Sequence, residues 1–255
     1  MTDSLSADAR LALDLALTVR HDGRGGVADD LATVRGLTAW VAEHPEAVSA
    51  VTTVVAVAPG SGATEPTETA GSAGPAGIEG VGSAEFQADA AALAAVREVR
   101  AAVRALFAHA VRPDEPSPAD AGRLIPLRDA VELLNARAAL VPTVPVLSWA
   151  EGAEPVVRQE PFVRQESVVR QEPFVRHEPL VLQVPAYDGS ALASALARAA
   201  IAFLASADRQ RLRACHAPRC VRYFLKDHPR QEWCKPSCGN RARVARHHER
   251  HKKTA

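Results

Sequence analysis

Four cysteines are the residues of this chain whose type and spacing point most clearly to a chemistry. They are its only cysteines, and all four lie near the C-terminus, at Cys215, Cys220, Cys234 and Cys238. The spacing is C-x4-C, then thirteen residues, then C-x3-C. Each close pair can form one clasp, and the segment between them can fold back to join the clasps around a tetrahedral ion. Four thiolates leave no open coordination position, so the pattern predicts one structural Zn²⁺.

Histidines in the same region offer another ligand set. Cys234, Cys238, His247 and His251 form the pattern C-x3-C-x8-H-x3-H. Its middle spacer is shorter than the roughly 12 residues usual for two-cysteine, two-histidine fingers. It also leaves the first cysteine pair without a role. We therefore favour the all-cysteine set and keep the histidine set as the alternative.

Basic charge is concentrated around the cysteines. Residues 209–255 hold 14 Lys and Arg against 3 Asp and Glu, a net charge of +11, whereas the other 208 residues hold 16 against 27, a net of −11. This asymmetry predicts an acidic body with a basic nucleic-acid-binding tail, the alternative being a solvated basic tail. A helix is expected over about 238–252. The candidate nucleic-acid-binding residues on it are Arg241, Arg243, Arg246, His247, Arg250, Lys252 and Lys253.

Two stretches resemble known families. The run W-C-K-P-S-C-G-N-R, residues 233–241, resembles the signature of the CGNR zinc-finger proteins, and L-R-A-C-H-A-P-R-C, residues 212–220, fits their first cysteine pair. The opening L-A-L-D-L-A-L-T-V-R and the later D-D-L-A-T resemble the start of the ABATE domain, which typically precedes that finger. The resemblance implies an ABATE-like domain over 1–208, a CGNR-type zinc finger over 209–255, and a role as a stress-induced transcription regulator.

Apolar residues at helical spacing predict the elements that position the cysteines. Helices are expected near 8–19, 32–43, 84–111, 125–139 and 190–207, with a helix start at 117–120 and either a strand or a helix tail at 46–56. Arginines 97, 100 and 104 should form a solvated helix face. On the helix 125–139, residues 127, 131, 134 and 138 should face inward. The expected fold class is therefore mainly α (α+β), a helical domain with a small β-hairpin or extended arm.

The finger is expected to be a small treble-clef-like four-cysteine module that ends in a helix. Residues 221, 223–225 and 233 should supply its own apolar core. Its hairpin should turn near 226–230, between the two cysteine pairs. The finger should follow the last body helix directly, which would let a change in the body reorient it.

Two inserts interrupt the helical pattern. Residues 58–82 are rich in Gly, Ser, Ala, Thr and Pro and should be disordered, because they cannot bury enough apolar surface to offset their ordering entropy. Residues 155–184 contain a hexapeptide repeat with the consensus P-x-V-R-Q-E. We interpret the repeat as a lengthened loop or hairpin arm that arose by tandem slippage, the alternative being an ordered interaction strand.

Several functional classes are not supported. No secretory signal or membrane span is apparent, so a cytoplasmic protein is expected. The glycine cluster at 21–26 lacks a phosphate-loop pattern, and no nucleophile–base arrangement is evident, so we do not expect an enzyme. We predict a zinc-dependent DNA-binding transcription regulator whose acidic domain senses a signal or assembles the protein, with no effector identified. The alternatives are an RNA- or ribosome-binding protein and a protein-interaction module, and a homodimer is left open.

Overall fold

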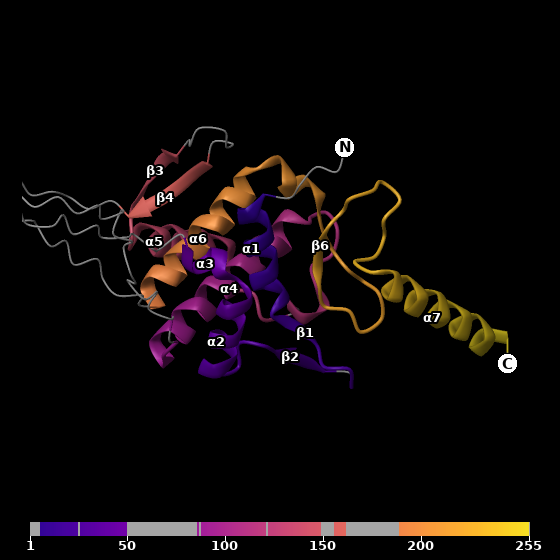
Figure 1. Cartoon of the computed structure of the whole chain (residues 1–255). Coiled ribbons are helices and arrows are strands. Elements are labelled where there is room, and N and C mark those ends of the chain that lie inside the picture. The colour runs from indigo at the N-terminus through magenta and orange to yellow at the C-terminus, as the bar shows by residue number, and fades with distance from the viewer. Residues whose placement is uncertain are drawn as a thin grey trace, which may run out of the picture.

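The computed structural model describes residues 6–24, 26–49, 86, 88–120, 122–148, 156–161 and 189–254, and these residues form a mainly helical protein (Figure 1). The helices are α1 (Ala7–Leu17), α2 (Val34–Glu43), α3 (Pro45–Ser49), α4 (Ala90–Ala110), α5 (Leu127–Ala139), α6 (Gly189–Ala205) and α7 (Pro236–Thr254), with short 3₁₀ turns η1 (Pro118–Asp120) and η2 (Ala207–Arg211). Antiparallel pairs join β1 (Val19–His21) to β2 (Val27–Asp29), β3 (Thr143–Ser148) to β4 (Val156–Pro161), and β5 (Leu212–Ala214) to β6 (Tyr223–Leu225). The predicted fold class is confirmed.

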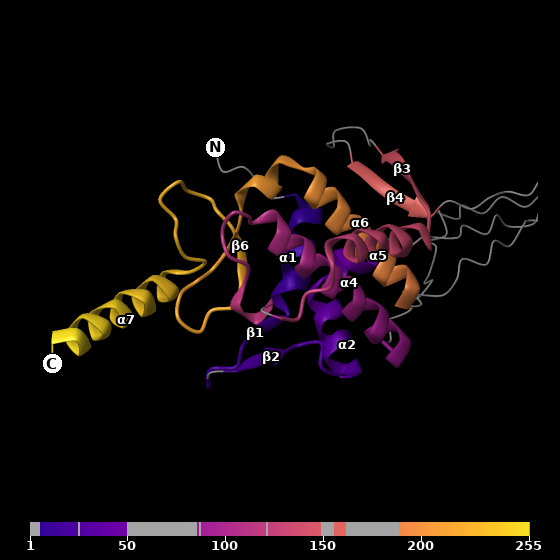
Figure 2. The ribbon, with the colours of Figure 1, turned by 180° about the vertical axis from the view of Figure 1, so that it is seen from behind.

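Helix α4 lies at the centre of the body. Its sequence alternates alanine with larger apolar residues, and its N-cap Asp89 accepts a hydrogen bond from the Ala92 amide at 2.6 Å. Helices α1, α2, α5 and α6 all contact it, and residues 102–108, which span every side of α4, are all buried (Figures 1 and 2). The approach of α6 is close: a Cβ added at Gly189 would lie 2.2 Å from Ala92 Cα. Only a residue without a side chain allows α6 to begin against α4.

The buried face of α5 differs from the prediction. Ala130 and Leu134 are buried, but Leu127 and Val131 are 42% and 43% exposed. Leu134 is buried in the core and Ala138 packs against it, so the prediction is right for these two residues and wrong for Leu127 and Val131. Helix α5 meets α4 and α6 through a face turned toward Ala130. Ala130, which the predicted stripe left out, has a small side chain that permits a close helix contact at that position.

The prediction of a solvated arginine face on α4 is wrong for Arg100 and Arg104. The exposed fraction is only 8% for Arg100 and 5% for Arg104. Arg100 donates from Nη1 to Thr18 Oγ1 at 2.9 Å and from Nη2 to Asp29 Oδ2 at 2.8 Å. The β1–β2 hairpin folds over this side of α4 and supplies that carboxylate, while Arg104 meets Asp120 from η1. Each buried guanidinium is thus neutralised by a carboxylate from a distant segment.

The other predicted segments fall partly within the described residues. Residues 45–49 form helix α3, opened by Pro45 at the first helical position, and the glycine cluster lies between the two strands of the β1–β2 hairpin. The predicted arm is present as β3–β4, in which the first repeat copy forms β4 and Val146 pairs with Arg158. The insert at 58–82 and the later repeat copies lie outside the described residues. None of the described helices is long and apolar enough to cross a bilayer.

Candidate metal centre and its basic helix

The four cysteines meet at one point. Their sulfur atoms all lie within 4.8 Å of one another. Cys220 Sγ is 3.6 Å from Cys234 Sγ, which in turn is 3.5 Å from Cys238 Sγ. Cys234 is half-buried and the other three are buried. Among the described residues, no histidine, aspartate or glutamate belongs to this group.

The first cysteine pair is placed by the β5–β6 hairpin. Cys215 directly follows β5, and its amide donates to the Arg222 carbonyl at 2.9 Å, which closes the turn. The Cys220 amide donates to the Ala217 carbonyl at 2.9 Å, and Arg219 between them has a left-handed φ of 63°. The β5–β6 hairpin therefore turns around the first cysteine pair. The chain also turns near 228–231, where the Gln231 amide donates to the His228 carbonyl at 2.9 Å, so the predicted turn is present but does not join the two strands of the hairpin. Residues 226–235 instead lead from β6 to α7 without a third strand.

The second pair is placed by the start of α7. Helix α7 begins at Pro236, two residues earlier than predicted, so Cys238 lies in its first turn. The Cys238 amide donates to the Lys235 carbonyl at 3.0 Å. A Cβ added at Gly239 would lie 3.1 Å from Trp233 Cδ1, so the glycine leaves room for the indole ring beside the sulfur cluster. The C-G step of the motif thus combines a ligand position with a close aromatic contact.

The thiols perturb one another strongly. Hydrogen bonding with the neighbouring Cys220 and Cys234 thiols lowers the pKa of Cys215 to about 2. Hydrogen bonding with Cys215 raises the pKa of Cys220 to about 11, and hydrogen bonding with Cys215 and Cys220 raises the pKa of Cys234. Without a cation, one thiolate therefore forms easily while its neighbours resist a second negative charge. A divalent cation among the sulfurs would remove this resistance.

The donor set fits one Zn²⁺. Sulfur ligands about 2.3 Å from a tetrahedral zinc ion lie roughly 3.8 Å from one another. The two sulfur–sulfur distances of 3.6 and 3.5 Å are close to that value, and the cluster holds four donors. Zinc bound by four thiolates would carry a net charge of about −2. The N-terminus of α7 and the guanidinium of Arg241 can offset it, since Arg241 Nη2 donates to Cys238 Sγ at 2.9 Å.

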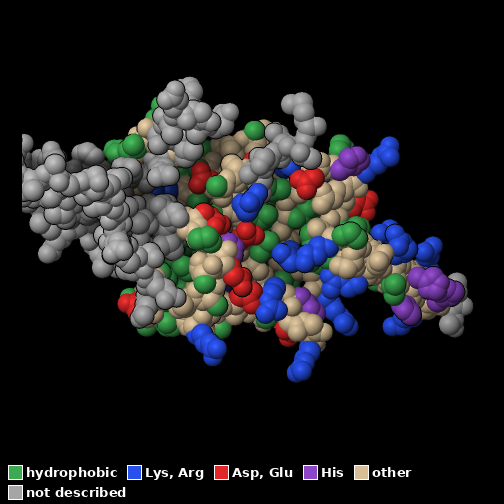
Figure 3. All heavy atoms as spheres, viewed as in Figure 1, with side chains coloured by type: hydrophobic (Ala, Val, Ile, Leu, Met, Phe, Trp, Pro, Cys, Tyr) green, Lys and Arg blue, Asp and Glu red, His purple; other side chains and the backbone are tan. Residues whose placement is uncertain are grey.

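Helix α7 projects from the body beyond the cysteines, as both ribbon views show (Figures 1 and 2). Ala242 is its last buried residue among 236–252. Lys, Arg and His side chains cover the projecting part in the space-filling view (Figure 3). Arg243 Nη1 donates to Asn240 Oδ1 at 3.0 Å, and Arg246 Nε donates to the Ala242 carbonyl at 3.4 Å, so both contacts lie within the helix. Glu249 is the only acidic residue of α7.

A buried polar network joins the finger to the body. Tyr223 of β6 is fully buried, and its hydroxyl donates to Asp120 Oδ2 at 2.6 Å. Arg104 Nε donates to the other oxygen of that carboxylate at 2.7 Å. The Ser117 hydroxyl donates to the carbonyl of Val221, which follows the first cysteine pair directly, at 2.8 Å. Burial, followed by the charge of Asp120, raises the pKa of Tyr223, so the hydroxyl keeps its proton and acts as a donor.

Comparison with known families agrees with this arrangement. Residues 9–207 match the ABATE family, described as a putative stress-induced transcription regulator, and residues 211–251 match the CGNR zinc finger. The chain belongs to the ABATE family. It carries the CGNR zinc finger at its C-terminal end, as the resemblance implied. A search of curated proteins gave no match.

The ABATE body contributes to the finger in a way that the sequence did not indicate. Tyr223 and Leu225, expected in a separate finger core, belong to the core of the body together with Leu212 and Ala214. The cluster around the sulfurs contains Ala217 and Phe224, with Trp233 packed against it. The alternation of the short strand β6 explains the division, since residues 223 and 225 point to one face and 224 to the other.

The predicted site residues therefore divide into two groups. The four cysteines and Arg241 come together at the centre, whereas Arg243, Arg246, His247, Arg250 and Lys252 lie exposed along α7. The side chain of Lys253 lies outside the described residues. Arg104, Ser117 and Asp120 were missed as residues that support the centre. No local signal could have identified them, because their partners lie far away in sequence.

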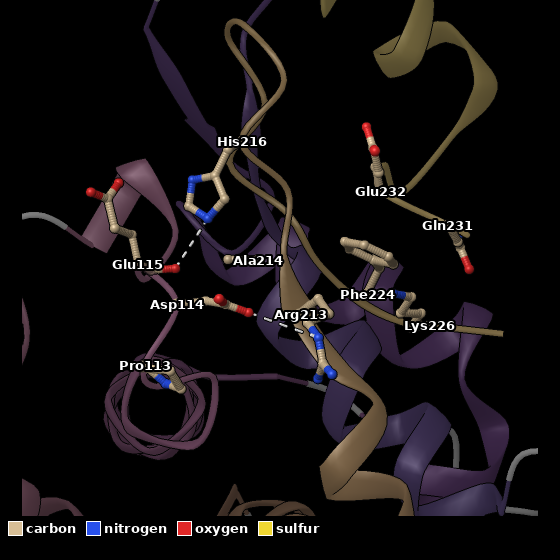
Figure 4. Close-up of a pocket in the computed structure, with 10 residues that line it drawn as sticks. All are labelled: Pro113, Asp114, Glu115, Arg213, Ala214, His216, Phe224, Lys226, Gln231 and Glu232. Carbon is tan, nitrogen blue, oxygen red and sulfur yellow. Dashed lines mark hydrogen bonds and ion pairs between the residues drawn. The ribbon is translucent and has the colours of Figure 1, made fainter. Parts of the chain in front are cut away.

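A cleft of about 500 Å³ lies between residues 113–115 of the body and the finger (Figure 4). His216 Nε2 is 3.1 Å from the Glu115 carbonyl oxygen across it, and Arg213 Nε is 3.9 Å from Asp114 Oδ2. Side chains of both charges line the cleft, and Phe224 lies on the finger side. These exposed contacts are a second, weaker attachment of the finger to the body.

Proposed function

We propose that this protein is a zinc-dependent DNA-binding transcription regulator. Cys215, Cys220, Cys234 and Cys238 would hold one structural Zn²⁺, and the exposed basic face of α7 would contact DNA. The observation that carries the proposal is the position of the sulfur cluster at the base of a projecting basic helix. When bound, zinc would fix the first turn of α7 against the β5–β6 hairpin. The family is one of transcription regulators, which agrees with a non-enzymatic role.

The shape and charge of α7 support contact with duplex DNA. A 19-residue helix is roughly 28 Å long, and a helix of ordinary width fits the major groove. Arg243, Arg246, His247 and Arg250 share one face at i, i+3, i+4 and i+7. Guanidinium groups suit bidentate contact with phosphate and with guanine. Arg241 is directed to Cys238, so we assign it to the metal centre and the other basic residues to DNA.

The body would set the direction in which α7 points. Because Tyr223 and the body share one buried network, the β5–β6 hairpin is attached rigidly to α4 and η1. A signal that changes the packing of α4 would therefore also move the finger. On this basis we propose that the acidic domain senses a signal or assembles copies of the chain.

Binding of the zinc-loaded full-length protein to duplex DNA tests the proposal. The variant carries Arg243→Gln, Arg246→Gln and Arg250→Gln together, and the matched control carries Arg128→Gln on the exposed side of α5. Fluorescence anisotropy with genomic fragments should show a large loss of affinity for the triple variant and none for the control, with one zinc retained by all. Equal affinity in the triple variant would contradict the role of α7.

Competition between nucleic acids tests the RNA alternative. Structured RNA and duplex DNA of equal phosphate number would be added to the same labelled complex. The DNA proposal predicts that duplex DNA competes better than RNA. Better competition by RNA would favour the RNA- or ribosome-binding function. If neither nucleic acid binds while the zinc-loaded protein captures acidic polypeptides, the protein-interaction function is favoured.

A further inference from the structure

Two histidines on α7 lie in a geometry that the proposed zinc centre does not use. His247 and His251 are one helical turn apart, and their Nε2 atoms are 3.1 Å from each other. Their ring centroids are 4.3 Å apart, and both residues are exposed. Neither belongs to the four-cysteine group. The pair therefore needs an explanation that does not involve that centre.

The distance between the two nitrogens matches chelation of one cation. Imidazole nitrogens bind zinc at about 2.0–2.1 Å, and two such ligands at right-angled or tetrahedral positions lie roughly 2.9–3.4 Å apart. The observed 3.1 Å falls within that range. The spacing i, i+4 is also the one at which two helical histidines bind zinc in metalloprotease helices. Imidazole suits borderline divalent ions such as Zn²⁺, Ni²⁺ and Cu²⁺.

We propose that His247 and His251 form a second, exposed site for a borderline divalent cation, independent of the four-cysteine centre. Two nitrogen donors leave coordination positions for water or for an oxygen of another molecule. The site would therefore bind its ion reversibly and more weakly than four thiolates do. His248, whose ring packs edge-on against His247 with centroids 6.1 Å apart, is not a member of the pair.

The position of the pair gives the ion a consequence for nucleic-acid binding, and this part rests on the proposed function. His247 shares its helix face with Arg243, Arg246 and Arg250. A bound divalent cation would add a charge of +2 to that face and could accept a phosphate oxygen as a further ligand. Metal in this site should therefore strengthen binding to duplex DNA. The metal site itself does not depend on that outcome.

A direct hydrogen bond between the two rings is the competing explanation. In that case one neutral imidazole donates its Nε2 proton to the other, and the contact requires no metal. The two explanations differ in metal stoichiometry. Chelation predicts an additional equivalent of metal that both histidines must supply, whereas a hydrogen bond predicts none.

Nickel titration of the untagged, zinc-loaded full-length protein tests the proposal. Calorimetry should detect one equivalent of Ni²⁺ while the zinc content, measured before and after, stays constant. Loss of a residue that only supports a metal ligand costs about 10–100-fold in metal affinity. Loss of a direct ligand, in His247→Ala or His251→Ala, should lower the affinity for Ni²⁺ at least as much. His248→Ala, the matched control, should bind Ni²⁺ as the wild type does.

Three results would overturn the site. They are the absence of Ni²⁺ binding to the wild type, unchanged binding after His247→Ala with His251→Ala, and an equal loss in His248→Ala. Anisotropy with duplex DNA, with and without Ni²⁺, separates this proposal from the proposed function. If Ni²⁺ binds as expected but no DNA binds in either condition, the metal site stands and the DNA-binding role fails.

Discussion

Replacement of Tyr223 by phenylalanine should destabilise the body and the finger together. The Tyr223 hydroxyl donates to Asp120 Oδ2 at 2.6 Å inside the core. Its ring packs edge-on against Phe107 with centroids 5.5 Å apart. Phenylalanine keeps that ring contact and removes only the hydroxyl, so the variant isolates the hydrogen bonds that the hydroxyl makes with Asp120 and with the Ser117 amide.

The expected loss follows from the partners that remain. A hydrogen bond to a buried charged group contributes about 1.5–3 kcal/mol. Arg104 still pairs with the Asp120 carboxylate in the variant, so the buried negative charge of Asp120 keeps a partner and the lower half of the range applies. The Ser117 amide also loses an acceptor at 3.3 Å. We expect a loss of about 2 kcal/mol, or roughly a 30-fold change in the unfolding equilibrium and a Tm lower by about 4–8 °C.

Two signals should report the loss in one denaturation experiment on the zinc-loaded protein. Far-UV circular dichroism follows the helices of the body, and a chromogenic chelator follows zinc release from the finger. Both midpoints should move together, because Tyr223 belongs to both regions. The control Glu132→Gln removes the negative charge of an exposed ion pair with Arg128 and should cost no more than about 0.5 kcal/mol.

Either of two results would refute the coupled unfolding of the body and the finger. The circular-dichroism midpoint of Tyr223→Phe could shift no further than that of the control. Alternatively, zinc release could become easier while the helical transition stays in place, which would mean that the finger unfolds independently of the body.

Three other perturbations test separate parts of the structure. Burial raises the pKa of Asp29, but the hydrogen bond and charge of Arg100 outweigh burial and lower the pKa overall. The Asp29 carboxylate therefore stabilises the fold above its unfolded pKa of about 3.9, and this stabilisation is lost as pH falls through the lower folded pKa. The stability gap between wild type and Asp29→Asn, about 1 kcal/mol by denaturation at pH 7, should stay constant to about pH 5 and close below about pH 4; a gap that closes well above that range would contradict the assignment. Arg219 has a left-handed φ of 63°, so Arg219→Gly should not lower the stability, whereas Arg219→Val should cost about 1–2 kcal/mol in a zinc-release assay. Equal zinc-release midpoints for the two variants would argue against backbone strain at this residue. Cys238→Ser should reduce the zinc content measured after gel filtration from one per chain to near zero, and full retention would remove Cys238 from the ligand set.

The features that sequence predicted well are those encoded locally. The spacing of the four cysteines and the start of the basic helix depend on residues within one 24-residue stretch, so their meeting could be expected from the pattern alone. The main helices follow from apolar periodicity in the same way. Even the histidine alternative was informative, because it identified the pair that the structure places together away from the sulfurs.

The features that sequence missed depend on contacts between distant segments. Helical periodicity placed Arg104 opposite an apolar stripe, on the side of a helix that is usually exposed to solvent. Its burial depends on Asp120 and on the Ala16 carbonyl, 88 residues away. Tyr223 was assigned to the finger because it is near the cysteines, but its core partner Phe107 belongs to α4. Neither contact has a periodic or motif signature.

The salt dependence of DNA binding is a direct test of the proposal that α7 contacts DNA phosphates. The affinity of the zinc-loaded full-length protein for a short duplex would be measured at several salt concentrations, for the wild type and for Arg246→Gln on α7. The logarithm of the affinity should fall linearly with the logarithm of the salt concentration. The slope should be smaller by about 0.9 in the variant, because one phosphate contact is lost. Zinc content should be the same in both proteins. Binding that does not depend on salt, or an unchanged slope for Gln substitutions at each of the exposed arginines of α7, would contradict the account.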